Sequence, residues 1–137
     1  MQSDIQNSVS KAALWGGRIM SWFAALFLLL DGVMKLFRPA VVVEATVKLG
    51  YPESVILPLG IVLTISTALY LIPRTSVLGA ILLTGYLGGA VATHVRVGEG
   101  WFPISFPIIF GILLWGGLYL RDQRLRKLIP LLQEGNQ

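Results

Sequence analysis

The chain has no cysteine and only one histidine among its 137 residues. The absence of cysteine excludes disulfide exchange, thiolate metal ligation and cysteine nucleophiles. A single histidine also argues against a transition-metal site built from protein ligands alone, so we expect no metal. Nucleotide and nucleophile motifs are missing too: there is no phosphate-binding loop, no G-x-S-x-G and no H-E-x-x-H. These absences leave open an enzyme that acts on a membrane-soluble substrate, so the residues decide neither for nor against catalysis.

Charge is also scarce. Only 13% of the residues are charged, whereas about 25% is usual in a soluble domain. Hydrophobic residues make up 55% of the chain, and they are gathered in long uninterrupted runs that a soluble core does not require. The composition therefore predicts a single membrane domain over residues 1–137.

Four apolar stretches each approach the roughly 20 residues that a helix needs to cross a bilayer. They are Leu14–Leu30, Ser54–Ile72, Val77–Val95 and Phe102–Leu120. The first helix should continue past its apolar run, which gives spans at about 14–36, 54–72, 77–95 and 102–120. Because the connections are short, neighbouring helices should be antiparallel. We expect an all-α, integral membrane four-helix bundle.

The connection between the first two spans is the longest. Within it, Pro39 can begin a helix and the sequence Gly50-Tyr51-Pro52 can end one. Residues 39–49 mix valines with a Glu44–Lys48 pair, which predicts a short helix at the membrane interface. A loop without regular structure is the alternative.

Basic residues are distributed unequally between the two sides that four spans define. One side, which includes both termini, carries seven: Lys11, Arg18, Arg74, Arg121, Arg124, Arg126 and Lys127. The other carries four: Lys35, Arg38, Lys48 and Arg96. The excess favours cytoplasmic termini. Since the cations of this +4 chain flank the spans, anionic lipid is the expected partner and nucleic acid is not. Control of topology is the ordinary role of such cations.

Small residues recur inside the last two spans. Gly85 and Gly89 form a G-x-x-x-G pair, and Gly116 and Gly117 lie together in the fourth span. Such positions let helix backbones approach closely, which favours association within a membrane. We expect helix packing at these glycines, within one chain or against a second copy or another membrane protein.

Polar residues gather where the first and third helices end. Asp31 and Lys35 are four residues apart and share a helix face, in the order that favours an ion pair. His94 should lie at the same membrane level, where a carboxylate neighbour would let it titrate near neutral pH. The candidates for ligand binding or proton relay are Asp31, Lys35, Tyr86, His94, Arg96 and Glu99. A purely structural role for this group is the alternative.

Three segments of the chain resemble the DoxX-like family. They are the sequences Asp31-Gly32-Val33-Met34-Lys35-Leu36-Phe37, Leu49-Gly50-Tyr51-Pro52 and Ala92-Thr93-His94-Val95-Arg96-Val97-Gly98. The resemblance spans about residues 14–120. It implies a small four-helix membrane protein, usually of a bacterial cytoplasmic membrane, and some relatives are linked to quinone-dependent sulfur oxidation or oxidative stress. Asp31 departs from the family, in which a small residue often precedes the glycine.

Three functions are therefore open. The first is a redox- or stress-linked subunit that binds a quinone or another lipid-like ligand at the polar group. The second is a non-enzymatic scaffold or assembly factor that binds a membrane protein through its small-residue faces. The third, a small proton-coupled transporter, is the least favoured because Asp31 and Lys35 lie at a helix end rather than at the bilayer midplane.

Overall fold

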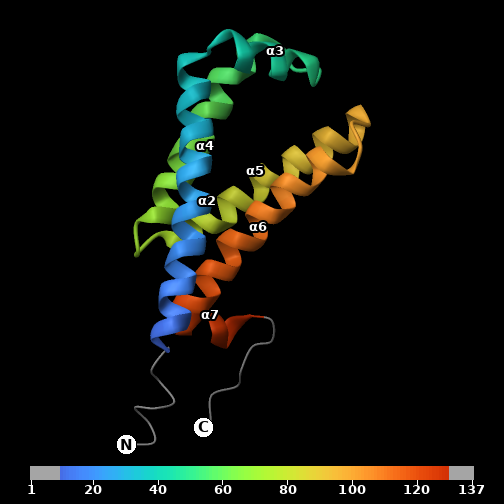
Figure 1. Cartoon of the computed structure of the whole chain (residues 1–137). Coiled ribbons are helices and arrows are strands. Elements are labelled where there is room, and N and C mark those ends of the chain that lie inside the picture. The colour runs from blue at the N-terminus through green and yellow to red at the C-terminus, as the bar shows by residue number, and fades with distance from the viewer. Residues whose placement is uncertain (1–9, 130–137) are drawn as a thin grey trace, which may run out of the picture.

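The computed structural model describes residues 10–129, and every regular element in this range is helical (Figure 1). The elements are α2 (Lys11–Phe37), α3 (Ala40–Lys48), the 3₁₀ helix η1 (Glu53–Val55), α4 (Ile56–Leu71), α5 (Ser76–Val97), α6 (Trp101–Arg121) and α7 (Gln123–Leu128). The predicted all-α fold is confirmed, and so is the short helix between the first two spans.

Four helices are long and apolar enough to cross a membrane: Lys11–Phe37, Glu53–Leu71, Ser76–Val97 and Trp101–Arg121. Their bounds lie within three residues of the predicted spans. The helices form a ring in which α2 packs against α4 and α6, and α5 packs against the same two helices. The chain is an integral membrane protein, and its surroundings are a lipid bilayer.

The bundle has two unlike ends. We call the end where α2 begins and α6 ends the terminal end, and the opposite end the α3 end. In Figure 1 the α2–α4 pair and the α5–α6 pair lie together near the terminal end and diverge toward the α3 end. The physical cause of this divergence is the distribution of small and aromatic residues along the helices.

Small residues bring the helices together at the terminal end. A Cβ built on Gly17 of α2 would lie 2.6 Å from the Gly117 carbonyl of α6, closer than real side chains come. Between α4 and α5, Gly79 packs directly on the backbone of Tyr70. Such close approach is what glycine permits in a membrane helix.

A buried polar network joins three helices at the same end. At its centre is Tyr70 of α4, which is completely buried. Its hydroxyl donates to the Leu114 carbonyl at 2.7 Å and lies 2.8 Å from Ser21 Oγ. The Arg121 guanidinium donates to the same Ser21 oxygen at 3.2 Å and stacks over the Tyr70 ring. The network connects α2, α4 and α6, and its bonds satisfy the buried hydroxyls of Tyr70 and Ser21, which would otherwise lack partners.

The short helix α7 was not expected from the sequence. Leu125 of α7 is buried against the bundle, and the Asp122 carboxylate accepts from the Arg124 amide at the helix start. Arg126 donates to the carbonyls of Tyr119 and Leu120, which the last turn of α6 leaves without helical donors. The basic cluster predicted as a lipid contact is thus partly a cap on α6.

Toward the α3 end the two pairs stay intact but separate from each other. Within the first pair, Gly60 of α4 lies against Lys35 of α2, where a Cβ would be 2.8 Å from the Lys35 Cβ. Within the second, the Trp115 indole donates to Thr84 at 2.6 Å. Between the pairs, Phe27 and Phe110 stack with their ring centroids 4.6 Å apart. Aromatic rings at this contact hold α2 and α6 farther apart than glycines would.

The predicted packing glycines behave in two ways: one pair contacts another helix of the bundle, and the other pair does not. Gly117 is buried against Gly17, and a Cβ on Gly116 would meet the Met20 methyl at 3.0 Å. Gly85 and Gly89 are different, because a Cβ on either would meet no heavy atom within 4 Å among the described residues. No helix within residues 10–129 packs on this G-x-x-x-G pair, and its role as a contact with another chain stays a prediction.

Candidate functional site

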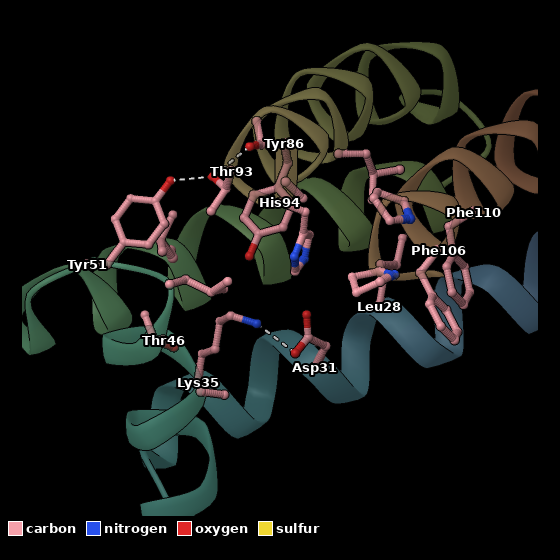
Figure 2. Close-up of a pocket in the computed structure, with 18 of the residues that line it drawn as sticks. Leu28, Asp31, Lys35, Thr46, Tyr51, Tyr86, Thr93, His94, Phe106 and Phe110 are labelled. Atoms are coloured by element: carbon pink, nitrogen blue, oxygen red, sulfur yellow. Dashed lines mark hydrogen bonds and ion pairs between the residues drawn. The ribbon is translucent and has the colours of Figure 1, made fainter. Parts of the chain in front are cut away.

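A cavity of about 780 Å³ occupies the space between the diverging helix pairs at the α3 end. Side chains from α2, α3, α4, α5 and α6 line it, together with Tyr51 from the connection that follows α3 (Figure 2). Four of the predicted site residues, Asp31, Lys35, Tyr86 and His94, are among them. The structure therefore brings these four together, although the two on α2 are 50 residues or more from the two on α5 in the sequence.

The directions of the helices give this cavity a polar and an apolar part. Leu28 lies about one turn before Asp31, and Leu87 about two turns before His94, both toward the terminal end. On α6, which runs the opposite way, Phe110 is the lining residue nearest the terminal end. The deep part is thus apolar, and the ionisable groups lie nearer the α3 end.

Asp31 and Lys35 form an ion pair on α2. Lys35 Nζ lies 2.6 Å from Asp31 Oδ1, and the two side chains are 14% and 40% exposed, respectively. A charge placed inside hydrocarbon costs at least about 2.5–3.5 kcal/mol at the bilayer centre and less toward the ends. Pairing reduces that cost, and the half-open Asp31 carboxylate keeps lone pairs free to accept a ligand hydrogen bond.

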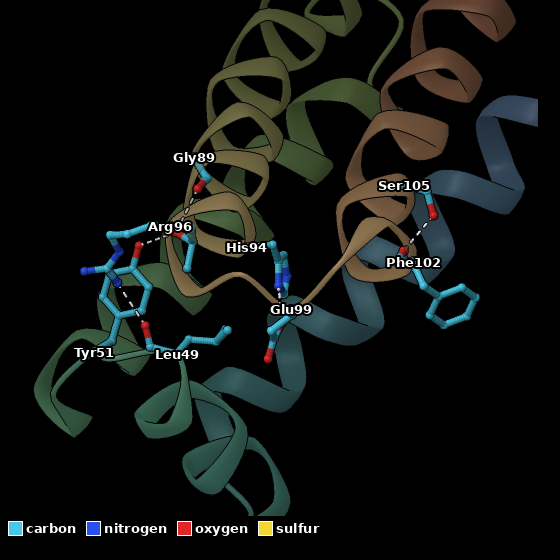
Figure 3. A network of polar contacts seen from close by, with 9 residues as sticks. Leu49, Tyr51, Gly89, His94, Arg96, Glu99, Phe102 and Ser105 are labelled. Atoms are coloured by element: carbon cyan, nitrogen blue, oxygen red, sulfur yellow. Dashed lines mark hydrogen bonds and ion pairs between the residues drawn. The ribbon is translucent and has the colours of Figure 1, made fainter.

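His94 pairs with Glu99 and not with Asp31. Its Nδ1 lies 2.6 Å from Glu99 Oε2 (Figure 3). The contact depends on the turn between α5 and α6, where Gly98 and Gly100 have φ values of +76° and +96° that favour glycine. The turn folds Glu99 back onto the last turn of α5. Because Nδ1 is engaged, Nε2 is the ring nitrogen left for a second partner, and Figure 2 shows the ring directed toward the space above Asp31.

The segment after α3, residues 49–51, is bonded to α5 by two contacts. We call this segment, with its two contacts, the strap. Thr93 Oγ1 donates to the Gly89 carbonyl and lies 2.6 Å from the Tyr51 hydroxyl, which donates to it. Arg96 donates to the Leu49 carbonyl at 2.9 Å and stacks over the Tyr51 ring. Residues of α3, including Thr46, consequently roof the cavity.

Two predicted site residues take other positions. Arg96 serves the strap and does not line the cavity, and Glu99 reaches the cavity only through His94. The sequence did not identify the bond between Tyr51 and Thr93, whose partners are 42 residues apart. Both residues stand in segments that carry the family resemblance, which is the one signal that could have pointed to them.

Aromatic residues mark a side opening of the cavity between α2 and α6. Phe27 and Phe106 line it and are nevertheless 50% and 44% exposed, and Phe102 lies beside them. Pro107 on the same wall has no N–H, so the Pro103 carbonyl of α6 lacks its usual helical donor. The opening lies within the membrane-spanning part of both helices, so it faces lipid.

The described residues contain no group of three or more histidine, aspartate and glutamate side chains that could hold a metal ion. Among the charged groups, Asp31 is paired with Lys35 and His94 with Glu99, whereas no hydrogen bond of the Tyr86 hydroxyl is seen among the described residues. This arrangement can bind a neutral polar group through one donor and one acceptor at a time.

A family model described as the DoxX-like family matches residues 19–117. The match covers well over half of the chain, with the second and third spans complete and most of the first and fourth, so the chain belongs to the DoxX-like family. No curated protein and no solved structure matches it.

Proposed function

We propose that this chain binds an amphipathic, lipid-like ligand in the cavity at the α3 end, and that a quinone is the leading candidate. The observation that carries the proposal is the cavity itself: about 780 Å³, apolar in its depth, polar near the α3 end and open between two membrane-spanning helices. Pockets of a few hundred to a thousand Å³ with a few convergent polar groups are typical ligand sites.

The polar groups favour a neutral headgroup. Each charge in the cavity already has a partner, so a net charge on the ligand would stay uncompensated. Lys35 can donate to a carbonyl or hydroxyl oxygen. Asp31 can accept from a hydroxyl, and so can Nε2 of a neutral His94, because its Nδ1–H donates to the Glu99 carboxylate. A quinone ring or its reduced form offers such groups on opposite sides.

The side opening accounts for the rest of such a ligand. A head at Asp31 and His94 would leave a chain that runs past Leu28 and Phe110 or out between Phe27 and Phe106. The ligand would enter from the bilayer, because α3 and the strap cover the route from the aqueous side. The chain offers no cysteine for electron transfer, so any redox chemistry belongs to the ligand or to a partner protein. In this reading the protein is a binding subunit linked to redox or stress processes.

The test is the identity of what co-purifies from native membranes. Mass spectrometry of the extracted protein should detect a quinone or another neutral lipid at close to one molecule per chain. The double variant Asp31→Asn, Lys35→Gln should lose it. The matched control is Glu44→Gln, Lys48→Gln, which removes an i,i+4 charge pair from exposed positions of α3. Equal retention by wild type and the cavity variant, or no ligand in any sample, would reject the proposal.

A non-enzymatic scaffold is the second candidate, and the exposed glycines favour it. A Cβ on Gly85, Gly88 or Gly89 would meet nothing within 4 Å, so a helix of a second copy or of a partner could approach there. Crosslinking in native membranes tests it: a partner lost on Gly88→Leu while His94→Ala is silent supports the scaffold. A phenotype that only His94→Ala abolishes contradicts it.

We further propose that the protein lies in a bacterial cytoplasmic membrane with the terminal end in the cytoplasm. The seven basic residues at that end, against four at the other, support this orientation. Because the native chain has no cysteine, single variants Arg74→Cys and Lys48→Cys report topology directly. A membrane-impermeant thiol reagent applied to intact cells should label only the second.

A further inference from the structure

A shallow apolar groove runs along α6 at the terminal end and shares no lining residue with the cavity already described. Its volume is about 390 Å³. On α6 its residues recur at helical spacing from position 112 to position 119, which spans roughly 10 Å along the helix axis. The groove residues are Ile112, Trp115, Gly116, Tyr119, Leu125 and Ile129. Its lower edge is therefore made by α7, at the level where the spans end.

Among the described residues, the charged side chains of α7 and its first flanking position are basic apart from Asp122. Leu125 is buried, which turns Arg124 and Lys127 of α7 outward, and both are exposed. Arg124 lies 3.7 Å from Asp122 with a side chain that is 90% exposed, a distance at which a surface pair contributes little. Arg126 is already engaged with the α6 carbonyls. Two cations thus remain available directly below an apolar groove.

We propose that this groove binds one anionic phospholipid, with its phosphate at Arg124 and Lys127 and an acyl chain along α6 past Tyr119 to Ile112. Three features on one face carry the assignment: cations at the depth of the headgroups, an apolar channel directed toward the bilayer centre, and the short helix that joins them. Basic residues at a membrane surface attract anionic lipid, and the groove adds a place for the chain. The site is independent of the cavity ligand.

The groove also gives Gly116 a role. A Cβ at this position would meet only the Met20 methyl, the end of a flexible side chain, at 3.0 Å. A larger residue can thus be accommodated by the fold, but it would fill the middle of the groove. Glycine keeps that path open.

Native mass spectrometry of the full chain in a mild detergent tests the site, with phosphatidylglycerol and phosphatidylcholine supplied at equal concentration. The wild type should retain one phosphatidylglycerol preferentially. Arg124→Gln, Lys127→Gln should reduce its affinity by about fivefold or more for each charge removed. The control Lys11→Gln, Arg74→Gln removes two exposed charges that the groove does not use, and it should keep the wild-type preference. Equal loss in both double variants would overturn the site in favour of general surface charge.

A second arm separates the lipid from its headgroup. Gly116→Leu should reduce phosphatidylglycerol retention while the melting temperature in detergent stays unchanged. Glycerol phosphate, which has the charge but no acyl chain, should not displace the bound lipid. Full displacement by glycerol phosphate, or unchanged retention by a folded Gly116→Leu, would show that the groove takes no part.

Discussion

The two ends of this bundle are built from the same helices and residue types, yet one end is closed and the other is hollow. At the terminal end, Gly17 packs on Gly117 and Tyr70 fills the centre with its hydroxyl bonded. At the α3 end, the same helices are separated by Phe27 and Phe110, and a cavity of about 780 Å³ lies between them. The closed end holds the helices, so the α3 end is free to present a site.

Glycine illustrates the difference most clearly. A glycine lets a neighbouring helix approach closely, but the approach occurs only where the surface of that helix fits the space that the glycine leaves open. Gly17 and Gly117 face each other, and each backbone occupies the space that the other leaves open. Gly85 and Gly89 have no such counterpart among the described residues, and their missing side chains widen the cavity instead. The same residue type therefore contributes stability at one end and volume at the other.

The largest expected effect comes from closing the space between α2 and α6 at the terminal end. Gly17→Leu forces a side chain into the Gly117 backbone and should destabilise the fold by about 3 kcal/mol. Gly16→Leu is the control, since a Cβ there meets nothing within 4 Å. The free energy of unfolding of both variants can be measured by titrating mixed micelles with increasing sodium dodecyl sulfate. Equal loss at the two neighbouring positions would mean that the close contact does not hold the bundle.

A smaller effect should follow from removing one hydroxyl from the buried network. Tyr70→Phe keeps the packing but leaves Ser21 and the Leu114 carbonyl with one partner fewer, which should cost about 1–2 kcal/mol. Tyr119→Phe is the matched control, because no hydrogen bond of the Tyr119 hydroxyl is seen among the described residues and its ring contact with Arg126 is retained. The same micelle titration should separate the two variants.

The strap should respond locally rather than globally. Tyr51→Phe removes the bond to Thr93 and should weaken the closure of α3 over the cavity by about 1 kcal/mol. Amide hydrogen exchange of residues 40–48 should accelerate several-fold, whereas exchange in α6 should not change. Acceleration throughout the bundle would show that the α3 end is not a separate unit and would remove the contrast between the ends.

The contrast between the ends also explains what the sequence could predict. The four spans follow from apolar runs of the length that a bilayer requires, and α3 follows from Pro39 and the Gly50-Tyr51-Pro52 ending, because these signals are local. The shared level of Asp31 and His94 follows from helix direction alone. Each of these inferences needs only one segment at a time.

The missed features depend on contacts between segments. The burial of Tyr70 is decided by Ser21 and Leu114, which lie on other helices. The choice of Glu99, rather than Asp31, as the partner of His94 depends on two turn glycines with positive φ, which one sequence does not reveal. The helix α7 is only six residues long, too short for a periodic pattern, and it is held by Leu125 and Arg126 against α6.

The smallest effect on stability, and the sharpest test of the contrast, is expected from Gly85→Leu. The same change from glycine to leucine disrupts the terminal end when it is made at Gly17. At position 85, however, the new side chain enters open space in the cavity wall. Stability should change by no more than about 0.5 kcal/mol, because nothing is displaced and leucine favours the helix.

Ligand retention should nevertheless be lost in Gly85→Leu, since the side chain occupies volume that the ligand needs. Gly88→Leu separates this effect from a change in the helix surface, because Gly88 is equally uncrowded but does not line the cavity. It should preserve both stability and ligand. If Gly85→Leu instead destabilises the protein as strongly as Gly17→Leu, the α3 end is packed in the membrane, and the division of the bundle into a holding end and a binding end is wrong.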